Sequence, residues 1–125
     1  MVPTAAMKTV LVVDDERAIR TAMSRALRDH CRVLVAESTD DALSQMKSEP
    51  IDVVLADYAM PGGTGEELLR AVSRDYPGVR RVLVSGTPPE HLDTLLEDGL
   101  VEIFVAKPWT VEEIVGVVKK LSGRS

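Results

Sequence analysis

The sequence predicts a doubly wound α/β domain, in which helices cover both faces of a parallel sheet. Five short runs are continuously hydrophobic rather than alternating, which is typical of strands that are buried on both faces. Each run is followed by a segment with hydrophobic residues at helical spacing, and this alternation with right-handed crossovers specifies parallel strands joined by helices. With 125 residues and 45% hydrophobic content, the chain suits one such domain and is too short for two.

The five predicted strands are rich in Val, Ile and Leu. They are TVLVV (9–13), RVLVA (32–36), DVVLA (52–56), RVLVS (81–85) and EIFVA (102–106). Hydrophobic residues three and four positions apart predict a helix after each strand. In chain order, these residues are Ile19, Ala22, Met23, Ala26 and Leu27; Ala42, Leu43 and Met46; Leu68, Leu69 and Val72; Leu92, Leu95 and Leu96; and Ile114, Val117, Val118 and Leu121.

Three of the helices begin with the pattern of a capping box, a threonine three residues before a glutamate. The pairs are Thr64 with Glu67, Thr87 with Glu90, and Thr110 with Glu113. Pro88 follows Thr87 and fits the first helical position, where a missing N–H costs nothing. We expect residues 8–121 to form the domain and residues 1–7 and 122–125 to be terminal tails.

The charge balance and the single cysteine exclude several classes of protein. A formal net charge of −5 argues against a basic nucleic-acid interface and against attraction to an anionic membrane. Cys31 is the only cysteine, so neither an internal disulfide nor a thiolate metal site can form, and a cytoplasmic setting is the default expectation. No hydrophobic run approaches the roughly 18 residues of a membrane span, and MVPTAAMK at the start lacks the hydrophobic core of a signal peptide.

Polar residues end or directly follow four of the hydrophobic runs, where the carboxyl ends of parallel strands meet and ligands bind in such folds. They are Asp14 and Asp15, Asp57, Ser85 and Lys107. Crowded carboxylates repel one another unless a cation is present, and an oxygen-rich cluster suits Mg²⁺. The lysine and the serine are suited to bind the oxygens of a phosphoryl group carried by one carboxylate.

These residues, on their elements and in their order, resemble the receiver domain of two-component response regulators. The resemblance extends over residues 8 to 121 and includes Pro108 after Lys107. It implies a flavodoxin-like domain, with a five-stranded parallel sheet in the order 2-1-3-4-5 and five helices. It also implies an aspartyl-phosphate switch that catalyses only its own phosphorylation and dephosphorylation and turns over no external metabolite.

The same resemblance implies a role for each matching residue. Asp57 would be the phosphoacceptor and would attack a phosphohistidine on a partner. Asp15 would bind Mg²⁺ directly, Asp14 largely through water, and the backbone carbonyl of Ala59 would be a further ligand. Lys107 would pair with the phosphoryl oxygens.

Two further residues match the positions that transmit the signal in this family. Ser85 would move to bond a phosphoryl oxygen, and Phe104 would be the switch aromatic that turns inward as Ser85 moves. The expected interface is the face formed by the fourth helix, fifth strand and fifth helix. The implied partners are a sensor histidine kinase or phosphotransfer protein, and a downstream protein or fused output domain absent from these 125 residues.

Two positions vary within the family pattern, and both bear on the lifetime of the phosphorylated form. Ala59 has no side chain that would hydrogen-bond an attacking water, whereas many relatives place a polar or longer residue there. Gly86 is small and leaves the phosphoryl group accessible. Together these positions do not fix a dephosphorylation rate.

Several alternatives remain beside this interpretation. Asp14 could simply cap the first helix, and MPGGTG (60–65) has the composition of a phosphate loop but lacks the Walker lysine and favours a tight turn. A degenerate receiver that only binds proteins is a second alternative. A flavodoxin-like cofactor binder is a third, although three carboxylates would repel a flavin phosphate. We expect no ligand at His30 or His91, a packing role for Cys31, and packing or a reporter role for Trp109.

Overall fold

Five strands and five helices alternate over residues 7–122, the part of the chain that the computed structural model describes. The strands are β1 (Thr9–Val13), β2 (Arg32–Ala36), β3 (Val53–Asp57), β4 (Arg80–Ser85) and β5 (Ile103–Ala106). The helices are α1 (Arg17–Leu27), α2 (Thr39–Ser48), α3 (Gly65–Asp75), α4 (Leu92–Glu97) and α5 (Val111–Leu121). The segments 1–6 and 123–125, expected as parts of the tails, lie outside the described residues.

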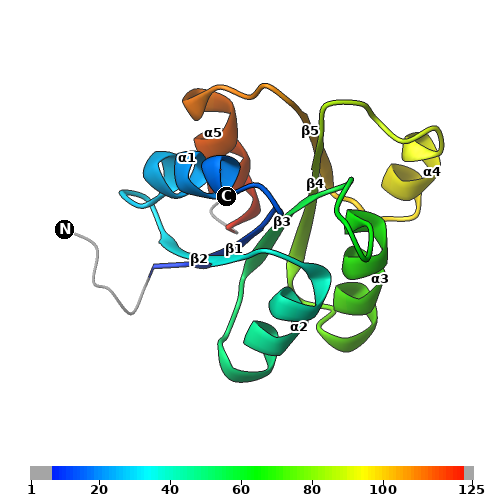
Figure 1. Cartoon of the computed structure of the whole chain (residues 1–125), viewed down its shortest axis with the longest axis horizontal. Coiled ribbons are helices and arrows are strands. Elements are labelled where there is room, and N and C mark those ends of the chain that lie inside the picture. Colours follow the sequence, from blue (N-terminus) through cyan, green and yellow to red (C-terminus); the bar gives the residue numbers. More distant parts are fainter. Residues whose placement is uncertain (1–6, 123–125) are drawn as a thin grey trace.

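The strands form one parallel sheet in the order β2-β1-β3-β4-β5, which confirms the expected topology. The helices α1 and α5 lie on one face of the sheet, and α2, α3 and α4 lie on the other (Figure 1). The pairing register brings the carboxyl ends of the strands to one edge: Val13 is opposite Ala56, and Ser85 is opposite Ala106. Residues that follow these strands are therefore neighbours in space.

The sheet separates two hydrophobic cores. Along β1, Leu11 and Val13 belong to the core beneath α2, α3 and α4, and Val10 and Val12 belong to the core beneath α1 and α5. These four side chains are at most 1% exposed, and burial of each contributes roughly 1.5–3 kcal/mol. Burial on both faces explains why the strand sequences are continuously hydrophobic.

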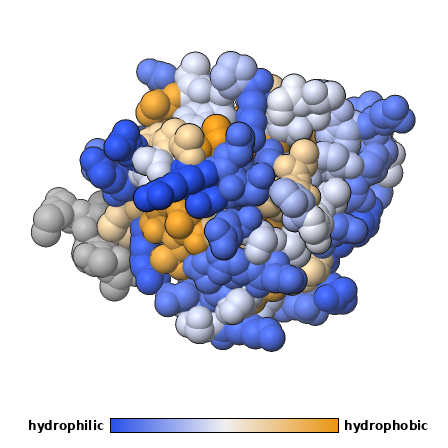
Figure 2. All heavy atoms as spheres, in the orientation of Figure 1, coloured by the Kyte–Doolittle hydropathy of each residue, from blue (hydrophilic) through white to orange (hydrophobic). Residues whose placement is uncertain are grey.

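Hydrophilic residues cover most of the face seen in Figure 2, and hydrophobic surface is visible in patches, one in the region of α1 and β2 and another in the region of α5. Within the described residues, no helix combines the length and the hydrophobicity needed to cross a membrane.

Two of the three predicted capping boxes are present. The Thr64 hydroxyl accepts the N–H of Glu67 at 3.2 Å and the Glu67 carboxylate accepts the N–H of Thr64 at 2.8 Å, at the start of α3. Thr110 and Glu113 make the same two bonds at the start of α5.

The third predicted box, at Thr87, is wrong. The Ser85 hydroxyl donates to the Thr87 carbonyl at 2.7 Å and accepts the N–H of Thr87, and α4 begins only at Leu92. Pro88 is followed by Pro89, and a residue before proline is disfavoured in the helical conformation, so Pro88 does not begin the helix. Residues 86–91 instead form an irregular segment beside the carboxyl edge of the sheet.

The segment 61–64 makes a turn into α3 and brings the helix against the end of β3. Gly62 has a φ of 80°, in the left-handed region that favours glycine. The N–H of Gly65 donates to the carbonyl of Tyr58 at 2.8 Å, and a Cβ at Gly65 would lie 2.3 Å from the Asp57 carbonyl oxygen. Gly62 thus allows the backbone conformation of the turn, and Gly65 allows the close approach of α3 to the end of β3.

Candidate functional site

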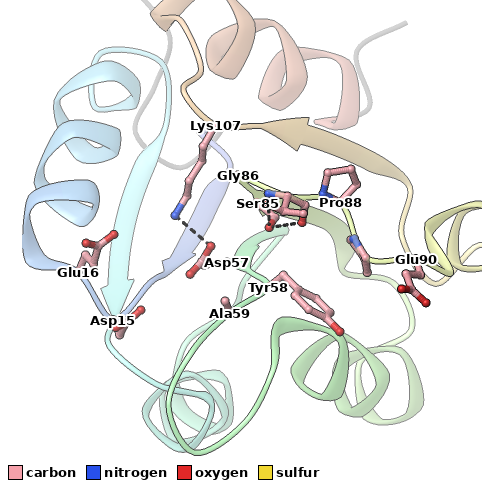
Figure 3. A pocket seen from close by; sticks show the side chains of 12 residues that line it. Asp15, Glu16, Asp57, Tyr58, Ala59, Ser85, Gly86, Pro88, Glu90 and Lys107 are labelled. Atoms are coloured by element: carbon pink, nitrogen blue, oxygen red, sulfur yellow. Dashed lines mark hydrogen bonds and ion pairs between the residues drawn. The ribbon is translucent and has the colours of Figure 1, made fainter.

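The structure brings the predicted strand-end residues together at the carboxyl edge of the sheet (Figure 3). Asp57 ends β3 and Ser85 ends β4, while Lys107 directly follows β5. The other two, Asp14 and Asp15, directly follow β1. Sequence reasoning therefore found the main polar residues of this edge, because parallel strands must deliver their ends to one side.

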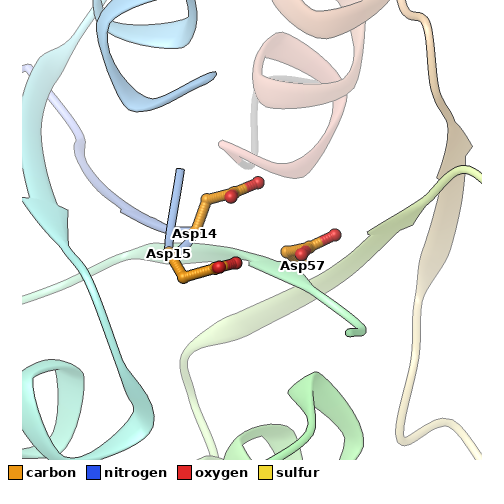
Figure 4. Close-up of side chains that lie close together, drawn as sticks. All are labelled: Asp14, Asp15 and Asp57. Atoms are coloured by element: carbon orange, nitrogen blue, oxygen red, sulfur yellow. The ribbon is translucent and has the colours of Figure 1, made fainter. Parts of the chain in front are cut away.

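The three aspartates form a compact cluster of oxygen ligands. One carboxylate oxygen from each lies within 4.8 Å of the other two (Figure 4). Asp14 and Asp57 are only 2% and 7% exposed, and Asp15 is exposed at the mouth of the cluster. Oxygen-only donors with an open side fit a hard divalent ion such as Mg²⁺, which is held by a few carboxylates and keeps several waters.

The ammonium group of Lys107 lies between two of these carboxylates. Its Nζ is 3.0 Å from Oδ2 of Asp14 and 3.0 Å from Oδ1 of Asp57. The backbone N–H of Lys107 donates to the carbonyl of Ser85 at 3.0 Å, which extends the β4–β5 pairing past the end of β5. The lysine therefore offsets part of the repulsion that would otherwise act between Asp14 and Asp57.

The pKa values at the site follow from burial and from these contacts. Burial raises the pKa of Asp57 above its ordinary 3.8, and the charges of Asp14 and Asp15 raise it further, while Lys107 lowers it without cancelling the increase. Burial alone would lower the pKa of Lys107, but hydrogen bonds and charges from Asp57 and Asp14 outweigh burial and raise it above 10.5. Lys107 therefore stays charged at neutral pH, and ionised Asp57 carries an electrostatic cost.

The contacts of Asp14 bear on the alternative that this residue only caps a helix. Its Oδ1 accepts the N–H of Glu16, the N-cap residue of α1, at 2.9 Å, while its Oδ2 accepts Lys107. The carbonyl oxygen of Asp14 accepts the guanidinium of Arg20 at 2.8 Å. The local turn and the ion pair thus use different oxygens of one carboxylate and coexist.

An open pocket of about 660 Å³ faces solvent beside this cluster (Figure 3). Asp15, Asp57, Ala59 and Lys107 line one part of it, and the irregular segment 86–90 lines another. Asp14 is absent from the lining. Among the three clustered aspartates, Asp57 alone both faces the pocket and contacts Lys107.

The residues expected to transmit a signal lie farther from the carboxylates. The Ser85 hydroxyl bonds to Thr87, and no bond to Asp57 is present among the described contacts. Phe104 is half-buried and packs against the core beneath α2, α3 and α4. Trp109 is half-buried against the core beneath α1 and α5.

One polar contact near the site was not predicted from the sequence. Nε2 of His91, just before α4, lies 2.5 Å from Oε1 of Glu66 in the first turn of α3. Burial favours a higher pKa for Glu66, but hydrogen bonds from His91 and Arg70 outweigh it and lower the pKa. Cys31 is buried, and burial raises the pKa of its thiol to about 11, which fits a packing role.

The comparisons with known proteins agree on one family. The model of the response regulator receiver domain matches residues 10–119. The hydrogenase transcriptional regulatory protein HoxA of Cupriavidus necator is 34% identical over 113 residues, which cover 90% of this chain and 23% of HoxA. The phosphate regulon regulator PhoB of Pseudomonas aeruginosa is 31% identical over 122 residues, which cover 94% of this chain and 53% of PhoB. The chain thus spans about a quarter to a half of these relatives.

Solved structures with the same fold include two with appreciable identity. An uncharacterized protein from Neptuniibacter caesariensis is 32% identical with a TM-score of 0.87, over 92% of this chain and 87% of that one. The response regulator TrrA from Thermotoga maritima, solved in complex with Mg²⁺ and BeF, is 29% identical with a TM-score of 0.81, over 92% of this chain and 99% of TrrA.

The raised pKa of Asp57 makes a prediction about stability. An acid whose folded pKa exceeds its unfolded pKa costs stability as pH rises through that interval. In metal-free buffer, Asp57→Asn should therefore raise the free energy of unfolding by about 1 kcal/mol at neutral pH, the size of an ordinary single-site effect. The gain should shrink as the pH falls through the raised pKa of folded Asp57, and it should be lost below 3.8, the ordinary pKa of this carboxyl. Urea denaturation at a series of pH values measures the gain in unfolding free energy and its dependence on pH.

Asp75→Asn is the matched control for this experiment. Asp75 is exposed, and its hydrogen bond with Arg74 lowers its pKa, so its removal should give no gain. A loss of stability in Asp57→Asn at neutral pH, or a gain that persists unchanged in acid, would contradict the electrostatic description of the site.

Proposed function

This chain belongs to the response regulator receiver domain family of two-component signal transduction, and from that premise we propose that it is a switch phosphorylated on Asp57. Members of this family are signalling domains rather than metabolic enzymes. The observation that carries the proposal is the position of Asp57, which both lines the open pocket and lies 3.0 Å from the Lys107 ammonium.

The proposed reaction is the transfer of a phosphoryl group from a phosphohistidine of a partner kinase or phosphotransfer protein. An oxygen of the Asp57 carboxylate attacks phosphorus, and a P–O bond forms as the P–N bond to the histidine breaks. The imidazole nitrogen keeps the electron pair of the broken bond and can take a proton from solvent. The product is an acyl phosphate on Asp57.

The other residues of the site act on the charge of the transferred group. Lys107 already contacts Asp57 and can reach a phosphoryl oxygen on it, in exchange for one of its present carboxylate partners. Asp14, Asp15, Asp57 and the backbone carbonyl of Ala59 would hold Mg²⁺, which when bound supplies positive charge next to the phosphoryl oxygens. The oxygen-only donor set and its open side support this assignment.

Phosphorylation would change the surface through Ser85 and Phe104. In this structure the Ser85 hydroxyl is engaged with Thr87 in the segment before α4. A phosphoryl oxygen on Asp57 would compete for this hydroxyl, and its withdrawal would release the Thr87 segment and allow Phe104 to change position. Phosphorylation would thereby shift the equilibrium between two arrangements of the face formed by α4, β5 and α5.

The output would reach either a downstream protein or a domain fused to this one. The two curated relatives named above are transcriptional regulatory proteins, and the matched region covers only part of each. A regulatory role in a larger signalling protein is therefore one concrete form of the proposal.

The proposed reaction makes a prediction about covalent labelling. Incubation of the wild-type chain with Mg²⁺ and acetyl phosphate should add one phosphoryl group, measured by intact mass, and Asp57→Asn should gain none. Asp75→Asn, which removes an exposed carboxylate outside the site, should be labelled like wild type. Excess EDTA should abolish the labelling, because carboxylates would then face the phosphodonor without the cation. Labelling of Asp57→Asn, or full labelling in EDTA, would reject the proposed site.

A further prediction concerns the conformational response. Trp109 is the only tryptophan and lies two residues after Lys107, so its emission reports on this turn without background. Beryllofluoride with Mg²⁺, a mimic of the phosphoryl group, should give a saturable emission change in wild type and none in Asp57→Asn. Ser85→Ala should bind the mimic with a response reduced several-fold, and Ser44→Ala, on the exposed surface of α2, should respond like wild type. A full response in Ser85→Ala would refute coupling through this hydroxyl.

A further inference from the structure

A basic groove lies between α1 and the edge strand β2, separate from the pocket that contains Asp57. It is about 320 Å³, and its lining includes Arg17, Arg20 and Arg25 of α1, the C-cap residue Arg28, and Val35 of β2. We propose that this basic groove docks an acidic segment of a partner protein that places a hydrophobic side chain on Val35. The proposal concerns a binding surface and is independent of the phosphoacceptor role of Asp57.

The arginines are arranged as a continuous stripe along one side of α1. Arg17 and Arg20, and again Arg25 and Arg28, are three residues apart, so each pair projects from the same side of the helix. Like charges at this spacing repel one another. Arg17 and Arg20 also lie in the first turn, where the helix dipole disfavours cations, and this turn contains no acidic residue. The stripe thus works against the stability of α1, which favours a role in binding.

No carboxylate among the described residues neutralises these four arginines. Several arginines outside the groove have acidic partners: Arg32 pairs with Glu49, and Arg80 pairs with Glu102. The guanidinium of Arg81 instead donates to four backbone carbonyls. No ion pair within 4.0 Å is found for the four groove arginines in the described range, and the guanidinium of Arg20 bonds to a backbone carbonyl. In a chain with a net charge of −5, this is a local concentration of uncompensated positive charge.

Val35 gives the groove a hydrophobic element. Its side chain is 40% exposed, and β2 is an edge strand of the sheet. Figure 2 shows hydrophobic surface directly beside strongly hydrophilic atoms in the region of α1 and β2. A hydrophobic contact bordered by cations is the arrangement expected for an interface with a charged rim.

Charge complementarity identifies the occupant as an acidic protein segment. Arginine guanidinium groups bind carboxylates through paired hydrogen bonds, and four of them suit a segment with several Asp or Glu residues. The exposed Val35 favours a ligand that also carries a hydrophobic side chain, as peptides do. A nucleic acid would meet the same arginines through its phosphates, but those phosphate contacts would make no use of the exposed Val35.

The test uses a fluorescein-labelled helical peptide whose glutamates recur at helical spacing on both sides of one leucine. Fluorescence anisotropy with the full chain should show saturable binding that weakens with added salt. The double variant Arg25→Glu and Arg28→Glu should weaken binding by about tenfold or more. Val35→Ser should weaken it several-fold, and the peptide with glutamine in place of glutamate should not bind.

The matched control carries the same charge change on the other side of the sheet. Lys47→Glu combined with Arg74→Glu alters exposed residues of α2 and α3 and should leave the affinity unchanged within about twofold. Asp57→Asn should also bind the peptide like wild type. A failure of the groove proposal can therefore be distinguished from a failure of the proposed phosphorylation site. Amide shifts in NMR spectra of the wild-type chain should change along residues 17–28 and at 33–35.

Three outcomes would overturn the proposal. Equal weakening by the control pair would show that only net charge matters. Absence of peptide binding, or amide shifts confined to other elements, would reject the groove. Tighter binding of a single-stranded oligonucleotide or of anionic phosphatidylserine vesicles at the same arginines would assign the groove to a different class of partner.

Discussion

The contact of one ammonium group with two buried carboxylates is the interaction on which the carboxyl edge of this protein depends. Lys107 lies 3.0 Å from both Asp14 and Asp57, which are almost inaccessible to water. Without that cation, two adjacent negative charges would share a poorly solvated site at a high energetic cost. In the proposed reaction the same group would neutralise a phosphoryl group on Asp57, so one interaction would serve both the resting site and that reaction.

The parallel sheet makes this contact possible. Asp14, Asp57 and Lys107 come from three distant parts of the chain, and only a shared carboxyl edge brings them together. Two separate cores hold the strands in register from both faces. The close packing of Gly65 against the Asp57 carbonyl then fixes the start of α3 beside the site. The stability of the cores thus supports an edge that is itself electrostatically costly.

The sequence predicted the strands, the helices and the strand-end residues because these follow from hydrophobic periodicity and from parallel topology. The strand order was predicted only from the family resemblance. Contacts that depend on competing local bonds or on helix packing could not be predicted. The Thr87 pattern failed because the Ser85 hydroxyl and the Pro88–Pro89 pair favour an irregular segment. The contact of His91 with Glu66 joins residues 25 positions apart, and no periodic signal marks it.

A double-mutant cycle between Asp57 and Lys107 tests the central interaction most directly. Unfolding free energies of wild type, Asp57→Asn, Lys107→Gln and the double variant would be measured by urea denaturation without divalent metal. Asp57→Asn should stabilise the Lys107→Gln protein more than it stabilises wild type, by on the order of 1 kcal/mol, because Asp14 and Asp57 repel each other unscreened once the ammonium is gone. Equal effects in the two backgrounds would contradict the view that Lys107 holds these carboxylates together.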